Sequence, residues 1–447
     1  MTMRNSATAL LGLAVMATCG LAVAQAPVGP NLTSTADEQT IAIIGGKLLT
    51  VSHGTIENGT VILQYGKIAA VGTPATVKIP TGATIIDAKG KTVYPGLFDS
   101  ESHLGLFEVG SDANARDLVE TADEIEPQMH VYDAFHAETE RIPVQRINGV
   151  TNALISPEPA DSLPGQDSVI QLYGRDRDEM FISKDAALSM NFMGDVRRRG
   201  GPGGGGKFPG TRMGVASQLR QTFLDAQAYE ASLKGDKKGP APKRDLKLEA
   251  LLPYLHGEKL VVLSCEEGYE VEVAMGIAKE FHLKVALNHL THTQDVLDKI
   301  ASYHVPVIVG PIYDAPMANE RYDAVFSLPA ELAKRGVTVA ISTGGEGMAD
   351  SRNLPYAAGY AVAYGLPYDE ALKSITLTPA TIFGLGDKLG SLDVGKTANV
   401  VIANGDPLDV RTNVEQVFID GIAVPMVSRQ TKLRDEYAPL VKGGMKQ

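Results

Sequence analysis

The segment that decides the fold begins with KLVVLSC at residues 259–265, followed by EVEVAMGIAKEFH at 270–282 and KVALNH at 284–289. The first and third pieces are short apolar runs typical of buried strands, and the second has apolar residues at helical spacing. The same alternation continues to VTVAIST at residues 337–343. Strands and helices that alternate in this way predict right-handed strand–helix–strand units around a parallel sheet.

Four more strand-like runs lie upstream of this segment. They are VYPGLFDS, GVTNALIS, SVIQLYG and AALSMNF, at residues 93–100, 149–156, 168–174 and 186–192. Together with the alternating segment they give about eight strands, the number that closes a barrel. We therefore expect an α/β fold with a (β/α)8 TIM-like barrel over residues 95–388, although its first half lacks equally clear helices.

The two ends of the chain have a different texture. Residues 37–94 and 389–447 contain short runs rich in Val and Ile that are broken by Gly, Asn and Lys-Gly pairs. This pattern is typical of antiparallel strands joined by tight turns. We expect the two ends to assemble into one β-sandwich beside the barrel.

A Gly-rich insert is expected at residues 196–247, between the fourth and fifth barrel strands. Gly201 to Lys207 has the GxxxxGK spacing of a phosphate-binding loop, but Phe208 stands where Ser or Thr would hold magnesium. A flexible loop is therefore favoured over a nucleotide site. A helical pattern follows at residues 215–233.

Charge and the N-terminus bear on partners and location. The formal net charge of −12 excludes a surface built for nucleic acid or anionic membranes, since both need clustered Lys and Arg. Arg4, an apolar run over residues 7–23 and small residues before Gln25 predict a signal peptide at residues 1–24, and hence a periplasmic or secreted protein with no membrane contact after cleavage. An uncleaved membrane anchor is the alternative.

The segment PGLFDSESHLG at residues 95–105 raises the question of a metal site. Glu101 and His103 are two residues apart, so on a strand they share a side. His289 ends the strand-like run KVALNH, and the carboxyl ends of parallel barrel strands meet at one face. These three side chains are the candidate site at that face.

Several longer stretches resemble the amidohydrolase superfamily, nearest to its imidazolonepropionase-like secreted branch. They are PGLFDSESHLG, SLPAELAKRGVTVAIST, ITLTPATIFGLGDKLGSLDVGKTANVVIANGDPL and VFIDG, and the similarity covers about residues 41–424. The resemblance implies a metal-dependent (β/α)8 barrel with a β-sandwich that hydrolyses amide or other C–N bonds in small or cyclic molecules. The family's metals polarise the scissile carbonyl and activate a bound water.

Carried over position by position, the resemblance implies a degraded set of metal ligands. The paired histidines of the first strand fall on Glu101 and His103, and the sixth-strand histidine is kept as His289. Ser264 stands at the fifth-strand histidine. Gly344 stands at the eighth-strand aspartate, which in the family binds metal and takes the proton of the attacking water. Three of the five usual positions have thus lost their ligand.

The remaining donors predict a weakened site. We expect Glu101, His103 and His289 to hold at most one divalent metal such as zinc, bound weakly. The catalytic base is unassigned, with Glu346 or Glu266 as the candidates and Glu267 as a further acidic donor.

Three residues near these donors in the sequence are predicted to support the site or to pack in the core. Asp99 and His292 are expected to surround the site through hydrogen bonds. Cys265 is expected to pack in the core, because strand alternation points it away from the side of Ser264.

Two kinds of function remain open from the sequence. One is a hydrolase with an altered single-metal site, acting weakly on a small amide-type molecule. The other is a non-catalytic relative that binds a ligand or pairs with an active homologue, or with copies of itself. We expect the barrel to be stable without metal, and we expect Gly344→Asp with Ser264→His and Glu101→His to raise metal occupancy.

Overall fold

The computed structural model describes residues 39–108, 115–120, 122–193, 208–234, 243–345 and 350–444. The predicted signal peptide and Glu346 lie outside these residues, as does the glycine-rich part of the predicted insert. None of the helices in the described ranges has the length and apolar character needed to cross a membrane.

Among the described residues, eight strands form a barrel-like sheet in which spatial neighbours are also neighbours in sequence. The first and last strands of this sheet approach each other, and the Ser100 hydroxyl lies 3.5 Å from the Ile341 carbonyl oxygen. The sheet is therefore nearly closed, as a TIM-like barrel requires. The strands are β6 (Leu97–Ser102), β7 (Val150–Ile155), β8 (Gly165–Gln171), β9 (Phe181–Asn191), β10 (Leu260–Glu267), β11 (Lys284–His292), β12 (Val307–Val309) and β13 (Val339–Ile341).

The expectation of a fully parallel barrel is wrong at β8. Strand β8 pairs antiparallel with both β7 and β9, whereas β6 pairs parallel with β7 and the run from β9 to β13 is parallel throughout. Only residues 156–164 connect β7 to β8, and a parallel crossover needs about a dozen residues or more. The short connection also explains why no helix lies between β7 and β8.

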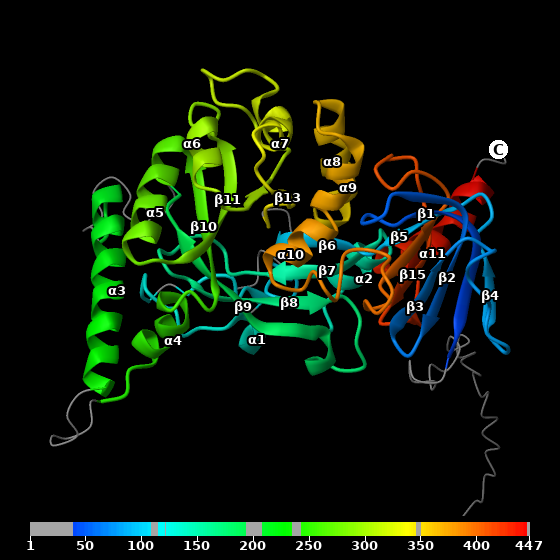
Figure 1. Cartoon of the computed structure of the whole chain (residues 1–447), viewed down its shortest axis with the longest axis horizontal. Helices are drawn as coiled ribbons and strands as arrows, with labels where there is room; N and C mark the ends of the chain where they lie inside the picture. Colours follow the sequence, from blue (N-terminus) through cyan, green and yellow to red (C-terminus); the bar gives the residue numbers. More distant parts are fainter. Residues whose placement is uncertain are drawn as a thin grey trace, which may run out of the picture. The chain divides into compact units, whose positions relative to one another are not determined.

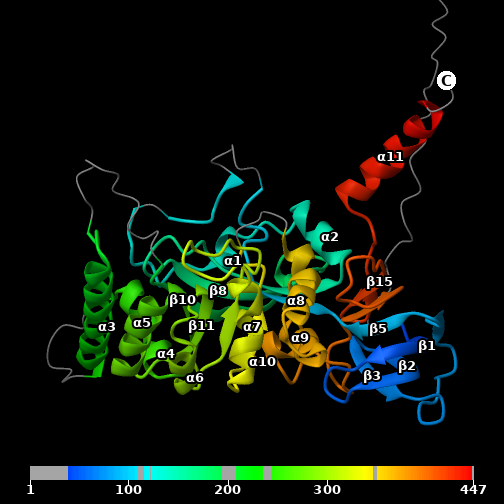
Figure 2. The ribbon, with the colours of Figure 1, turned by 90° about the horizontal axis from the view of Figure 1, so that it is seen from above.

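Helices follow the strands of the second half, where the sequence predicted them. Two of them, α3 (Arg212–Lys234) and α5 (Gly268–Glu280), run side by side (Figures 1 and 2), and the rings of Phe223 and Phe281 join them with centroids 5.1 Å apart. Part of the predicted insert is therefore a helix packed on the barrel. The other helices are α1 (Val131–Ala134), α2 (Arg141–Arg146), α4 (Leu246–Leu255), α6 (Leu297–Ser302), α7 (Ala324–Lys334), α8 (Leu354–Ala363), α9 (Tyr368–Ser374), α10 (Leu377–Ile382) and α11 (Arg429–Gly444), with 3-10 turns η2 (Asp178–Met180) and η4 (Asp350–Asn353).

Both ends of the chain contribute to a second sheet. This sheet contains β1 (Ile41–Leu49), β2 (Thr55–Gln64), β3 (Lys67–Gly72), β4 (Thr84–Asp87), β5 (Thr92–Pro95), β14 (Val400–Ala403), β15 (Val414–Ile419) and β16 (Ile422–Ala423). Strand β14 pairs antiparallel with β5, which joins the N-terminal and C-terminal strands side by side (Figure 1). Assembly from both ends is as expected, while the two-layered sandwich stays a prediction, because these strands pair as one sheet.

An apolar layer joins the eight barrel strands. It takes at least one buried side chain from every strand and closes against the segment after α10, where the Phe98 and Phe383 rings stack with centroids 6.0 Å apart. Three of the nine strand residues in this layer are alanine and the others are larger apolar residues, a mixture that can fill the barrel interior without leaving voids. The strand members are Phe98, Leu154, Val169, Ala187, Leu260, Val262, Ala286, Ile308 and Ala340.

Candidate functional site

A polar layer follows the apolar layer along the strands. Ser189, Ser264 and Asn288 each come two residues after an apolar-layer member of their strand, so they point to the same side of the sheet. The Asn288 side-chain amide donates to the Ser264 hydroxyl at 3.3 Å. The hydroxyl that replaces the expected histidine therefore has a partner of its own within the barrel.

Asp167 on β8 belongs to this polar layer, although it was not among the predicted site residues. The Ser189 hydroxyl donates to its Oδ1 at 2.7 Å, and the residue is fully buried. Burial raises the pKa of the Asp167 carboxyl well above its usual value, and the Glu101 charge adds to this. The available signal was an acidic residue directly before the predicted strand-like run SVIQLYG at residues 168–174.

Two of the three predicted metal donors, Glu101 and His289, are in direct contact. Nε2 of His289 lies 3.1 Å from Oε1 of Glu101, and both residues are buried. Burial alone would raise the pKa of Glu101, but the His289 charge, its hydrogen bond and the more distant His103 outweigh it, so the pKa is lowered. We call Glu101 and His289 the inner pair.

The backbone at the end of β11 departs from an ordinary strand. His289 and Leu290 have φ angles of +68° and +56°, in the left-handed region that non-glycine residues seldom adopt. Such backbone conformations persist only where the surroundings enforce them, and they cluster at functional sites. The two left-handed residues interrupt the alternation of side chains between the two faces of the strand. No pattern in the sequence indicated this interruption.

Asp99 connects the first and last barrel strands. It accepts hydrogen bonds from the Thr343 hydroxyl at 2.6 Å and from the Thr343 backbone N–H at 3.1 Å. Burial raises the pKa of Asp99 to about 6, although these hydrogen bonds oppose the shift. Asp99, which was predicted to surround the site through hydrogen bonds, thus links the first barrel strand to the segment after the last one. It lies two residues before Glu101 in the sequence.

Gly344 has no space for a side chain. Its φ is +76°, and a Cβ placed on it would lie 2.5 Å from Cδ and 2.6 Å from N of Pro311. The neighbouring Gly345 faces His103, whose Nε2 lies 2.5 Å from the position of a Cβ there. The other ring nitrogen of His103, Nδ1, donates to the Ser156 carbonyl oxygen at 2.7 Å.

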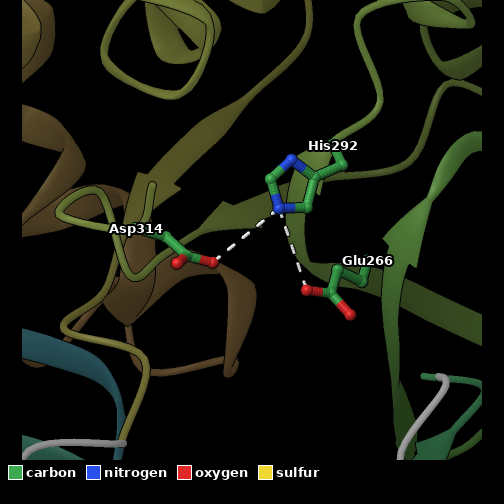
Figure 3. Close-up of side chains that lie close together, drawn as sticks. All are labelled: Glu266, His292 and Asp314. Atoms are coloured by element: carbon green, nitrogen blue, oxygen red, sulfur yellow. Dashed lines mark ion pairs between the residues drawn. The ribbon is translucent and has the colours of Figure 1, made fainter. Parts of the chain in front are cut away.

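A second group of carboxylates and imidazole lies at the ends of neighbouring strands. In the part of the chain that the structure describes, one group of three potential metal ligands lies close together: Glu266, His292 and Asp314. One ligand atom from each of these residues lies within 4.8 Å of the other two. Their side chains converge on Nε2 of His292 (Figure 3), at 3.8 Å from Glu266 and 3.9 Å from Asp314. We call these residues the rim triad.

The rim triad combines predicted and unpredicted residues. Glu266 was a candidate base and His292 a candidate supporting residue, whereas Asp314 was not identified. Burial raises the pKa of Glu266, with the His292 charge opposing it. Asp314 lies in the irregular segment after β12, and a lone acidic residue in a loop carries no signal before the fold is known.

Two further predicted residues have structural roles. Glu267 is the N-cap of α5, and its carboxylate pairs with Arg212 at 3.4 Å. Cys265 is fully buried in the apolar core, and burial, with the Glu270 charge, raises the pKa of its thiol well above the usual value. The expected packing role for Cys265 agrees with this burial.

Comparison with known proteins identifies the family. The profile of the amidohydrolase family matches residues 258–424. An imidazolonepropionase from Brevibacillus brevis is 24% identical over 424 residues, covering 83% of this chain and 89% of that protein. The crystal structure of an amidohydrolase from Thermotoga maritima superimposes with a TM-score of 0.79 at 29% identity, covering 87% of this chain and all of the other. The chain belongs to the amidohydrolase superfamily.

Another relative is similar over only part of its own length. Amidohydrolase tasK from Hapsidospora irregularis is 27% identical over 392 residues, which is 82% of this chain but 40% of that protein. The chain thus spans less than half of this amidohydrolase. The shared region includes most of the barrel, so the relationship concerns the fold that carries the site.

The residues at the family's metal positions fit a metal poorly. By the resemblance, the chain has Ser264 and Gly344 where two ligands would stand. Ser264 is hydrogen-bonded to Asn288, and Gly344 lies against Pro311. The imidazole of His289 already faces Glu101 at 3.1 Å. That these are the family's ligand positions stays a prediction.

Proposed function

We propose that this amidohydrolase hydrolyses C–N bonds of small amide-type molecules slowly, at the carboxyl ends of its barrel strands. The observation that carries the proposal is the inner pair: a buried carboxylate in contact with an imidazole at that end of the barrel. The names of the relatives, amidohydrolase and imidazolonepropionase, support the same class of bond. A secreted or periplasmic location is part of the proposal.

The chemistry available to the inner pair is proton transfer. A carboxylate that accepts from an imidazole holds the ring in place and stabilises its protonated form. Glu101 and His289 therefore form a unit that can take up and release a proton beside a bound substrate. Because Gly344 offers no acid at the family's position, turnover is expected to be about 10²- to 10⁴-fold below that of a relative with its base in place.

The test is a substrate screen with paired variants. The purified full chain is assayed against linear amides, cyclic amides and dipeptides, together with Glu101→Gln, His289→Asn and the control His53→Ala. His53 is 78% exposed on the strand-rich end of the chain. We expect both inner-pair variants to lose at least 10-fold in kcat/KM and the control to match the unmodified protein. Full activity in His289→Asn contradicts the proposal.

A second candidate is a non-catalytic relative that binds a ligand or pairs with an active homologue. It is favoured by the backbone at Gly344, which has no space for the family's catalytic side chain. Calorimetry with the same compounds separates the candidates. Binding without any product after prolonged incubation supports the second, while product formation that depends on His289 supports the first.

A further inference from the structure

We propose that the rim triad binds one divalent ion of the zinc class through Glu266 Oε1, His292 Nε2 and Asp314 Oδ2. These residues differ from the positions that the resemblance assigns to metal. The proposal goes beyond the hydrolytic function and does not depend on it, because ion binding is measured without a substrate.

The imidazole of His292 is held with one nitrogen facing the other two ligands. Its Nδ1 donates to the Glu320 carboxylate at 2.8 Å, and that carboxylate is itself held by the Met317 backbone N–H at 2.8 Å. A histidine that donates through Nδ1 has its lone pair on Nε2 in the neutral ring. Carboxylate support of this kind is the usual arrangement behind a metal-binding histidine.

The two carboxylates are positioned from their own strand ends. Asp314 Oδ1 accepts from the Ala315 backbone N–H at 2.8 Å, which leaves Oδ2 facing His292. The backbone N–H of Glu266 donates to the buried Glu270 carboxylate at 2.9 Å. Each ligand thus has an orienting contact, although Glu266 is fixed through its backbone and not through its side chain.

The spacing within the rim triad leaves space for an ion. The separations of 3.8 and 3.9 Å exceed hydrogen-bond length. Around a tetrahedral zinc with bonds of about 2.0–2.2 Å, two ligand atoms lie about 3.4 Å apart. Binding therefore requires each carboxylate to approach His292 by about half an ångström. The two carboxylate oxygens, which lie within 4.8 Å of each other, would also have to come to about the same 3.4 Å, and both side chains are partly exposed.

The local charge also calls for a cation. Within the described residues, His292 is the only basic side chain within 4.0 Å of Glu266, Asp314 or Glu320. Three carboxylates around one imidazole repel each other unless a cation is shared among them. An imidazole ligand favours zinc and similar transition ions over magnesium and calcium.

Three protein ligands leave one position of a tetrahedral zinc for water, as in catalytic sites. Glu266 and His292 are on parallel strands β10 and β11, and Asp314 follows β12, so the ion lies at the carboxyl-end face of the barrel. That is the face on which TIM barrels place their active sites. Glu266 comes two residues after Ser264 and His292 three residues after His289, which are the positions that the resemblance assigns to metal on these strands. The ion would therefore lie further out along the strands than a metal at those positions.

The experiment is titration of the metal-free full chain with Zn²⁺, followed by calorimetry and by elemental analysis after gel filtration. We expect one Zn²⁺ per chain, and at least a 10-fold loss of affinity in His292→Ala and in Asp314→Asn. Glu320→Gln is expected to weaken binding by about 10-fold through loss of imidazole orientation. Mg²⁺ is expected not to compete.

Matched controls separate this site from ordinary surface charge. His256 also has two carboxylates nearby, Glu230 at 2.9 Å and Glu258 at 3.7 Å, but they contact different ring nitrogens. His256→Ala should bind zinc as the unmodified protein does, and so should Glu101→Gln. A thermal melt without zinc establishes that each variant is folded, and the exposed Asp314 provides a second variant if His292→Ala is unfolded.

Three results overturn the proposal. They are no zinc uptake by the unmodified chain at 100-fold excess, undiminished affinity in folded His292→Ala or Asp314→Asn, and loss of zinc in Glu101→Gln with retention in the rim variants. The last result would assign the ion to the inner pair. None of these outcomes bears on whether the protein hydrolyses amides.

Discussion

The inner pair and the rim triad both join carboxylate to histidine at the same end of the barrel, yet they differ in spacing and exposure. Glu101 and His289 are in direct contact at 3.1 Å with side chains only 4% and 3% exposed. In the rim triad the corresponding distances are 3.8 and 3.9 Å, and the two carboxylates are about one-third exposed. The comparison teaches that the same residue types form a closed ion pair in one place and an open ligand set in another.

The largest expected effect comes from breaking the inner pair. Glu101→Ala removes the carboxylate that contacts the buried His289, and breaking a buried pair typically costs about 3–5 kcal/mol. We expect that loss in the free energy of unfolding, measured by urea denaturation. Glu266→Ala in the rim triad is the matched comparison, with an expected change below about 1 kcal/mol because its side chain is partly exposed. Equal losses in the two variants would erase the distinction between the sites.

The next effect concerns Gly344, which follows the last barrel strand and lies against Pro311. Gly344→Ala is expected to cost about 1–2 kcal/mol for a left-handed residue, plus about 1–3 kcal/mol for overlap with Pro311. Gly336→Ala is the control, since Gly336 has φ +79° with nothing within 4 Å of the new Cβ, and it incurs only the first cost. Chemical denaturation of both variants measures the difference.

The same geometry revises the expectation from sequence about restored ligands. The combined Gly344→Asp, Ser264→His and Glu101→His variant is now expected to unfold more easily without gaining zinc, because the Cβ that the first substitution adds would meet Pro311. A stable variant with raised zinc content would show that the backbone at Gly344 adapts.

A smaller effect is expected from Asp167, the buried carboxyl near the inner pair. Its folded pKa is raised by burial above the unfolded value near 3.9. Between these values the folded state keeps a proton that the unfolded state releases, so the stability from this group is lost as pH rises through the folded pKa. Asp167→Asn should therefore be more stable than the unmodified protein at pH 8, and the difference should shrink as the pH falls to 4. Parallel melting curves for both proteins at every pH would contradict this.

The smallest effect is expected from zinc itself. With free zinc at its dissociation constant, linkage adds RT ln 2, about 0.4 kcal/mol, to the free energy of unfolding. A chelator removes only that amount, because the barrel core does not depend on an ion. Thermal melts with and without EDTA measure it. A large fall on chelation would place the ion in the buried inner pair and not in the rim triad.

The sequence predicted the second half of the barrel well. Alternating buried strands and amphipathic helices from residue 259 onward carry their own periodicity, and β10 to β13 lie where it indicated. The strand β8 was predicted as a strand but with the wrong direction, because strand direction depends on the length of a connection whose ends were not known. The joining of both chain ends in one sheet also followed from their shared texture.

The site was predictable only where a motif or family position marked it. Glu101, His103 and His289 stood out from their spacing and from the resemblance, and the structure brings Glu101 and His289 into contact. Asp314 could not be found, since it reaches His292 from a loop with no pattern. The left-handed backbone at His289 and Leu290 was equally hidden, because those residue types do not favour it.

The most direct measurement is anomalous diffraction at the zinc edge from crystals of the metal-free full chain soaked in Zn²⁺. The account predicts one strong peak bounded by Glu266 Oε1, His292 Nε2 and Asp314 Oδ2, and no peak between Glu101 and His289. A peak at Glu101, His103 and His289 with none at the rim triad would contradict it.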